Sequence, residues 1–198
     1  GIAGGLVQPV SGNAVNAGPP LQHALILAFD GVLFDTLPAR TAALREALAA
    51  EGFDLSEDLV RAALPGRAMA EALQQLDPAP QDPTRHDLVL LRAQRLYAGI
   101  IAHGVPLLPE GLAALRDAVA SGHRVVLRSD SERRHVEPLL ALSGLETQVS
   151  LLRCADDPPR GGGSSFDRSW QHIDERLQRL GIAPTQRIVH EFTASSAT

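Results

Sequence analysis

Hydrophobic residues gather in short unbroken runs along this chain, and longer stretches with helical spacing separate the runs. The first run covers residues 24–29 (ALILAF) and is stopped by Asp30 and Gly31. Its length and its turn boundary favour a strand that is buried on both faces over a helix.

No further strand pattern appears between residues 37 and 103, where we expect four helices. Pro38 stands in a first-turn position, and Gly52 follows the end of the first helix. Ser56 is a suitable N-cap for the second helix. The four expected helices cover residues 38–52, 56–64, 66–76 and 84–104.

From residue 105 onward, helical and strand patterns alternate. The expected helices are 109–122, 131–144 and 166–181, and the expected strands are 124–129, 148–154 and 187–192. This alternation predicts an α/β protein with a Rossmann-like, doubly wound parallel sheet, whose ligands bind at the carboxyl ends of the strands. We expect a flexible arm (residues 1–20), a core (21–36 and 105–198) and an inserted helical cap (37–104).

Composition narrows the classes of partner. The chain of 198 residues has a net charge of -5 and no basic stretch, which argues against nucleic acid as the main partner. No apolar run approaches the ~20 residues that cross a bilayer, so no membrane partner is expected. Residues 1–20 lack the basic start and apolar block of a secretory signal. The single Cys154 cannot form an internal disulfide, which is typical of the cytoplasm.

Three segments, in this order and at this spacing, resemble the haloacid-dehalogenase-like hydrolase superfamily. They are residues 26–36 (ILAFDGVLFDT), residues 104–146 and residues 177–191 (LQRLGIAPTQRIVHE). The resemblance spans roughly residues 22–193 and points to the branch with a helical cap after the first strand. That branch includes phosphoglycolate phosphatase, β-phosphoglucomutase and phosphonatase.

The resemblance implies a particular phosphoryl-transfer chemistry. In the family, the first Asp of a D-x-D-G sequence attacks phosphorus, and the second Asp acts as general acid and base. A hydroxyl after the second core strand binds the phosphoryl oxygens, a Lys or Arg neutralises charge, and acids after the last motif strand hold Mg²⁺. The cation screens the repulsion between the phosphate and the attacking carboxylate.

Matched to this pattern, the chain lacks the nucleophile. Ala28 falls on the attacking Asp, while Asp30 and Gly31 fall on the acid-base Asp and its Gly. Asp30 cannot simply replace the nucleophile, because the acid would then be at position 32, which is Val32. A laboratory substitution at position 28 would also explain Ala28, but it would leave the other motifs intact.

The other motifs are altered as well. Ser129 falls on the phosphate-binding hydroxyl and is followed by Asp130. The chain contains no Lys, so Arg160 or Arg153 would have to supply the positive charge. Glu191 falls on the first metal-binding acid, but Phe192 follows in place of an Asp. Only Asp30 and Glu191 remain as metal ligands, and we expect weak Mg²⁺ binding or none.

Structural roles remain open for several of these residues. Asp30 can cap the turn after its strand, and Ser129 can be a turn residue instead of an anion ligand. Arg67 lies in PGRAM, where related caps reach toward substrate, but it can equally be a solvated helix residue.

The sequence thus leads to two hypotheses of function. In the first, the chain is a phosphatase-like protein that has lost phosphoaspartyl catalysis and binds a phosphorylated metabolite or a protein partner. In the second, it is an active phosphatase or phosphonatase in which Asp30 or Glu191 activates water. A third possibility, that the chain is a fragment ending at Thr198, would make both moot.

Overall fold

The computed structural model describes residues 22–159 and 162–192, so the expected arm lies outside the described residues. The strands are β1 (Ala24–Ala28), β2 (Arg124–Arg128), β3 (Leu151–Arg153) and β4 (Arg187–His190). The helices are α1 (Leu37–Ala50), α2 (Glu57–Ala63), α3 (Met69–Gln75), α4 (Pro83–Ile101), α5 (Pro109–Ala120), α6 (Arg133–Ser143) and α7 (Ser165–Arg179).

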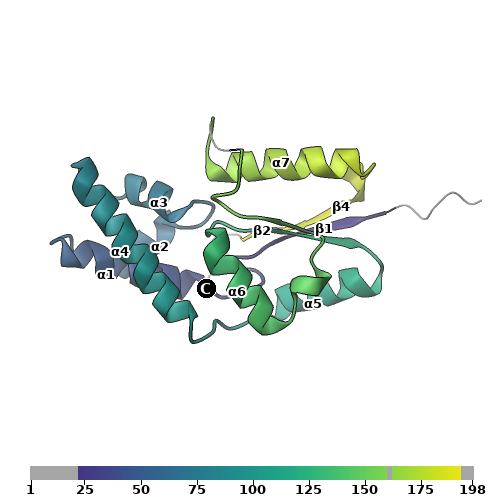
Figure 1. Cartoon of the computed structure of the whole chain (residues 1–198), viewed down its shortest axis with the longest axis horizontal. Coiled ribbons are helices and arrows are strands. Elements are labelled where there is room, and N and C mark those ends of the chain that lie inside the picture. Colours follow the sequence, from purple (N-terminus) through teal and green to yellow (C-terminus); the bar gives the residue numbers. More distant parts are fainter. Residues whose placement is uncertain (1–21, 160–161, 193–198) are drawn as a thin grey trace, which may run out of the picture.

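The four strands form one parallel sheet in the order β3-β2-β1-β4, as the alternating pattern predicted. Helix α7 covers one face of the sheet, and α5 and α6 cover the other (Figure 1). Leu25 and Leu27 of β1 belong to the cluster under α5 and α6, whereas Ala24 and Ile26 pack with α7. Strand β1 therefore needs apolar residues at successive positions, because both of its faces are buried.

Helices α1 to α4 form the expected helical insert between β1 and α5. They gather beyond the carboxyl ends of the strands (Figure 1), where they lie over the site described below. The predicted N-cap is present, since the Ser56 hydroxyl accepts a hydrogen bond from the Leu59 amide. None of the helices in the described part of the chain has the length and apolar character needed to span a bilayer.

Two predicted elements are shorter in the structure. The strand expected from residue 148 begins only at Leu151, because residues 146–148 form a 3₁₀ turn and pairing with β2 starts late. The helix expected from Gly66 begins at Met69. Gly66 has a φ of 75°, which is not helical, and its amide donates a hydrogen bond to Asp130 of the core.

The loop after β1 is held against the start of α5 by a close backbone approach at Gly111. A Cβ atom placed on Gly111 would lie 2.0 Å from the carbonyl oxygen of Val32. The Leu108 amide also donates to the carbonyl of Leu33 at 2.9 Å. These contacts fix the loop that carries Asp30.

We predict that Gly111→Ala destabilises the protein by about 1–3 kcal/mol, because the added methyl group has no room and the loop must shift. The control is Gly99→Ala in α4, where a Cβ meets no atom within 4 Å. That change should instead stabilise by about 0.5–1 kcal/mol through helix propensity. Urea unfolding measures the stability of both variants. Equal changes in their free energy of unfolding would contradict the close approach of Gly111 to the backbone of Val32.

Candidate functional site

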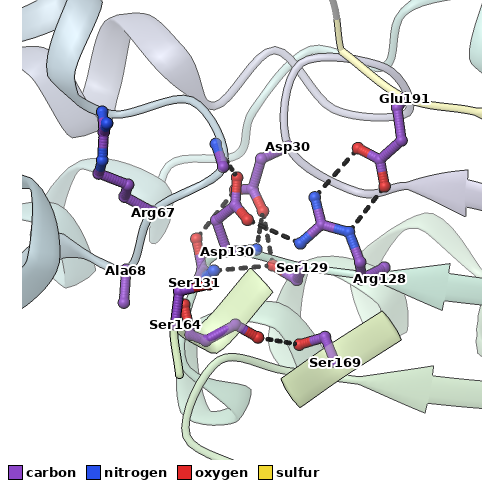
Figure 2. Close-up of polar contacts among 12 residues, drawn as sticks. Asp30, Arg67, Ala68, Arg128, Ser129, Asp130, Ser131, Ser164, Ser169 and Glu191 are labelled. Atoms are coloured by element: carbon purple, nitrogen blue, oxygen red, sulfur yellow. Dashed lines mark hydrogen bonds and ion pairs between the residues drawn. The ribbon is translucent and has the colours of Figure 1, made fainter. Parts of the chain in front are cut away.

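Polar residues meet where the carboxyl ends of β1, β2 and β4 come together. Asp30 follows β1, Ser129 and Asp130 follow β2, and Glu191 follows β4 (Figure 2). Parallel strands bring their carboxyl ends to the same edge of a sheet, which is where ligands bind in open α/β folds.

The carboxylate of Asp30 is fully hydrogen-bonded within the protein. Its Oδ1 accepts from the hydroxyls of Thr36 (2.8 Å) and Ser131 (2.9 Å). Its Oδ2 accepts from the Ser129 hydroxyl (2.6 Å) and the Asp130 amide (2.9 Å). Four donors use the roughly four acceptor sites of an ionised carboxylate. The Ser129 hydroxyl has a single proton, which it gives to Asp30 and cannot also offer to a phosphoryl oxygen.

Asp30 remains ionised although it is only 8% exposed. Burial by itself would raise the pKa of its carboxyl group, but the nearby Arg40 guanidinium and the three hydroxyl donors outweigh burial and lower the pKa. Arg40 is itself buried and donates from Nη2 to the carbonyl of Arg67 at 2.8 Å. The carboxylate and its donors thus form a closed polar cluster.

A second polar cluster surrounds Arg128, the last residue of β2. Its Nε and Nη2 donate to the two carboxylate oxygens of Glu191 at 2.7 and 3.0 Å, and its Nη1 donates to Asp130 at 2.8 Å. The guanidinium also lies over the ring of Phe166, 4.6 Å from its centroid. Arg128 is only 3% exposed, so it is a buried charge with two carboxylate partners.

Position 28, which the resemblance matches to the family's nucleophile, carries a methyl group. Ala28 is 1% exposed and pairs in register with Arg128. Beside it, the ring of Phe192 lies so close to Gly31 that a Cβ on that glycine would be 2.6 Å from the ring. An apolar ring therefore stands where the resemblance expects a second metal-binding acid.

The residues present do not fit a Mg²⁺ site. Both oxygens of Glu191 are engaged by Arg128, and all acceptor sites of Asp30 are used by donors of the chain. Within residues 22–159 and 162–192, no group of three His, Cys, Asp or Glu side chains is arranged to hold a metal ion. A divalent cation would have to displace a guanidinium or several hydrogen bonds.

A cavity of about 390 Å³ lies between the helical insert and the core, beside the Asp30 cluster. Its polar lining includes Arg40, Gln94, Tyr97, Ser131, His135 and Arg168. Tyr97 is buried, and its hydroxyl lies near Thr36 and Ser131 of the Asp30 cluster. A larger hollow of about 480 Å³ beside α6 and β3 contains none of the strand-end acids Asp30, Asp130 and Glu191.

Polar contacts join the insert to the core around this cavity. The Gly66 amide donates to Asp130 at 3.0 Å, and the Ser165 amide donates to Glu71 of α3 at 3.1 Å. The side chain of Gln94 in α4 donates to Glu132.

Of the three arginines proposed from the sequence, the two that the structure describes make other contacts. Arg67 points away from the acid cluster (Figure 2) and donates to the carbonyl of Ala63. Arg153 donates to the carbonyls of Asp157 and Pro158. Arg160 lies outside the described residues.

Sequence reasoning missed Arg40, Thr36 and Arg128. Arg128 carried a usable signal, since a charged residue ending an apolar strand must find buried partners. Arg40 and Thr36 carried none, because they read as ordinary residues at the start of a helix.

Comparison with known proteins places this geometry in a wider context. No protein-family model matches the chain. Protein CbbY of Rhodobacter capsulatus is 38% identical over 126 residues, which cover 60% of this chain and 55% of that protein. The chain thus matches about half the length of this curated relative.

Solved structures share the fold at low sequence identity. A predicted phosphoglycolate phosphatase from Haemophilus somnus 129pt has a TM-score of 0.69 and 17% identity, covering 87% of this chain and 77% of that one. CbbY from Rhodobacter sphaeroides was solved in complex with phosphate, with a TM-score of 0.65 and 17% identity, covering 85% and 76%. A second structure of that protein, a mutant in complex with xylulose-(1,5)bisphosphate, has the same TM-score, identity and coverage.

The parallel sheet, the helical insert after β1 and these likenesses agree with one another. The chain has the fold of the haloacid-dehalogenase-like hydrolases that carry a helical cap after the first strand, and part of its sequence is similar to Protein CbbY.

Proposed function

We propose that this protein has lost phosphoaspartyl catalysis and binds a small phosphorylated metabolite in the cavity between cap and core. The observation that carries the proposal is the buried methyl group of Ala28 at the nucleophile position. Truncating the nucleophile of another covalent enzyme, subtilisin, costs about 10⁶ in kcat. From a typical ~10 s⁻¹, such a loss would leave about one turnover per day.

The neighbouring carboxylates are poorly placed to substitute for the missing one. Asp30 is held by four donors, and Glu191 is held by two nitrogen atoms of Arg128. An acid that activates water needs a free acceptor site for the water's proton. These contacts support a structural role for Asp30 and speak against the alternative of an altered hydrolytic mechanism.

The cavity supports a ligand-binding function. Its volume of about 390 Å³ falls within the range of small-molecule sites. Arg168 lies on its wall and can offer N–H donors to an anion. Related CbbY structures hold phosphate or a sugar bisphosphate. Because Asp30 uses the Ser129 hydroxyl and the Asp130 amide, we place the ligand's phosphoryl group toward Arg168.

We predict no turnover of an aryl phosphate above background, with or without Mg²⁺. Ala28→Asp alone should not restore activity, because Arg128 and Phe192 would still occupy the metal region. Release of the phenol measures the rate. Turnover by the wild type that Asp30→Asn abolishes would overturn the proposal.

We predict that Asp30→Asn destabilises the protein at neutral pH by about 2–4 kcal/mol, because hydrogen bonds to a charged group are lost. The folded-state pKa of Asp30 is lowered, so its contribution is complete above the unfolded pKa of about 3.9 and is lost as the pH falls through the folded pKa. The difference in the free energy of unfolding between the wild type and Asp30→Asn should therefore become smaller at acidic pH.

Urea unfolding at several pH values from neutral to strongly acidic measures this gap. Asp54→Asn, at an exposed position between α1 and α2, is the control and should change little at any pH. A gap for Asp30→Asn that stays constant down to low pH would contradict an ionised, stabilising Asp30.

We predict that at least one member of a panel of sugar phosphates raises the unfolding temperature. A ligand at 100 times its Kd stabilises by about 2.7 kcal/mol. Arg168→Ala should remove the shift, whereas Arg176→Ala, at an exposed position two turns further along α7, should keep it. A flat response of the wild type would favour a protein partner.

A further inference from the structure

We propose that the guanidinium of Arg128 takes the place of the family's divalent cation, so that the chain itself supplies the positive charge between these carboxylates. This inference deepens the proposed function, and it rests on the assignment of Ala28 and Glu191 to the nucleophile and metal positions. Three nitrogen atoms of one side chain bind two carboxylates that follow two different strands.

The contacts of Arg128 are those of a buried cation paired with carboxylates, and not those of a surface arginine. The pair with Glu191 is bidentate, with both nitrogen-oxygen distances at or below 3.0 Å. The third donor reaches Asp130 at 2.8 Å. Charge-assisted bonds of this fork geometry are among the strongest that arginine makes. One guanidinium therefore does what Mg²⁺ does elsewhere, which is to hold carboxylates of separate strands together.

The local structure explains why an arginine fits here. The residue paired with Arg128 on β1 is Ala28. Because the side chain of Ala28 is a single methyl group, the long side chain of Arg128 meets no carboxylate or bulky group there. The ring of Phe166 forms a face for the guanidinium to rest on, 4.6 Å away. The rest of β2 from Val125 to Leu127 is buried and apolar. A charge at the end of such a strand is tolerated only when it is paired.

The exchange of a metal for a side chain has a functional consequence. A guanidinium keeps its charge at every physiological pH and cannot be removed by a chelator. Asp130 and Glu191 then share one positive charge in every molecule, whatever the supply of divalent cations. Restoring the missing nucleophile would not by itself recreate a metal site.

The test is thermal unfolding of the chelator-treated protein with and without millimolar Mg²⁺ or Mn²⁺. The wild type should show no metal-dependent shift. Arg128→Ala should lower the unfolding temperature by roughly 10 °C, because the buried Asp130 and the partly exposed Glu191 both lose their cationic partner. Either metal ion should then raise it again by several degrees.

Two further variants isolate the effect. Arg128→Ala/Glu191→Gln should lose the metal response, because one of the two carboxylates is neutral. Arg124→Ala, at the other end of the same strand, should show neither the large loss nor any metal response. A metal response shared by the wild type, or none in Arg128→Ala, would overturn the inference.

If Arg128→Ala does not fold on expression, the comparison becomes refolding from urea with and without metal. Recovery of folded protein only with metal supports the inference, and failure in both conditions overturns it. No substrate enters this experiment, so its outcome is separate from that of the phosphatase assay. A metal response in the wild type would refute the role of Arg128 and leave the loss of catalysis standing.

Discussion

The structure depends on one buried carboxylate, that of Asp30, three of whose four hydrogen bonds tie the loop after β1 to the end of β2. An ionised group can remain in such a place only because each acceptor site is used and Arg40 compensates its charge. The same bonds consume the hydroxyl and the amide that a phosphoryl group would otherwise use. The bonds that stabilise the loop are therefore also the bonds that support the proposed loss of catalysis.

The fold could be predicted from the sequence because it follows from local patterns. The run at residues 24–29 is apolar throughout, since β1 is buried on both faces, and the later alternation of helices and strands fixes a parallel sheet. The element ends were harder to place. Gly66 was expected to begin a helix, but its amide instead donates a hydrogen bond to Asp130. Such a long-range interaction leaves no trace in the local sequence pattern.

The site could be predicted only where position along a strand determines place in space. The sequence brought Asp30, Ser129 and Glu191 to one edge of the sheet, and the structure brings them there. It could not show that Asp30 bonds to Ser129, nor that Arg128 reaches Glu191, because both depend on side-chain directions. Arg40 was invisible for the same reason, since its partner is a backbone carbonyl 27 residues away.

The polar contacts between the helical insert and the core affect how fast a ligand can come and go. The bonds from Gly66 to Asp130, from Ser165 to Glu71 and from Gln94 to Glu132 bridge the two sides of the cavity. A working phosphatase must release product in every cycle, so its cap has to swing open readily. Under the proposed function no such repeated opening is required, and a cap held by three hydrogen bonds suits long residence times better than rapid exchange.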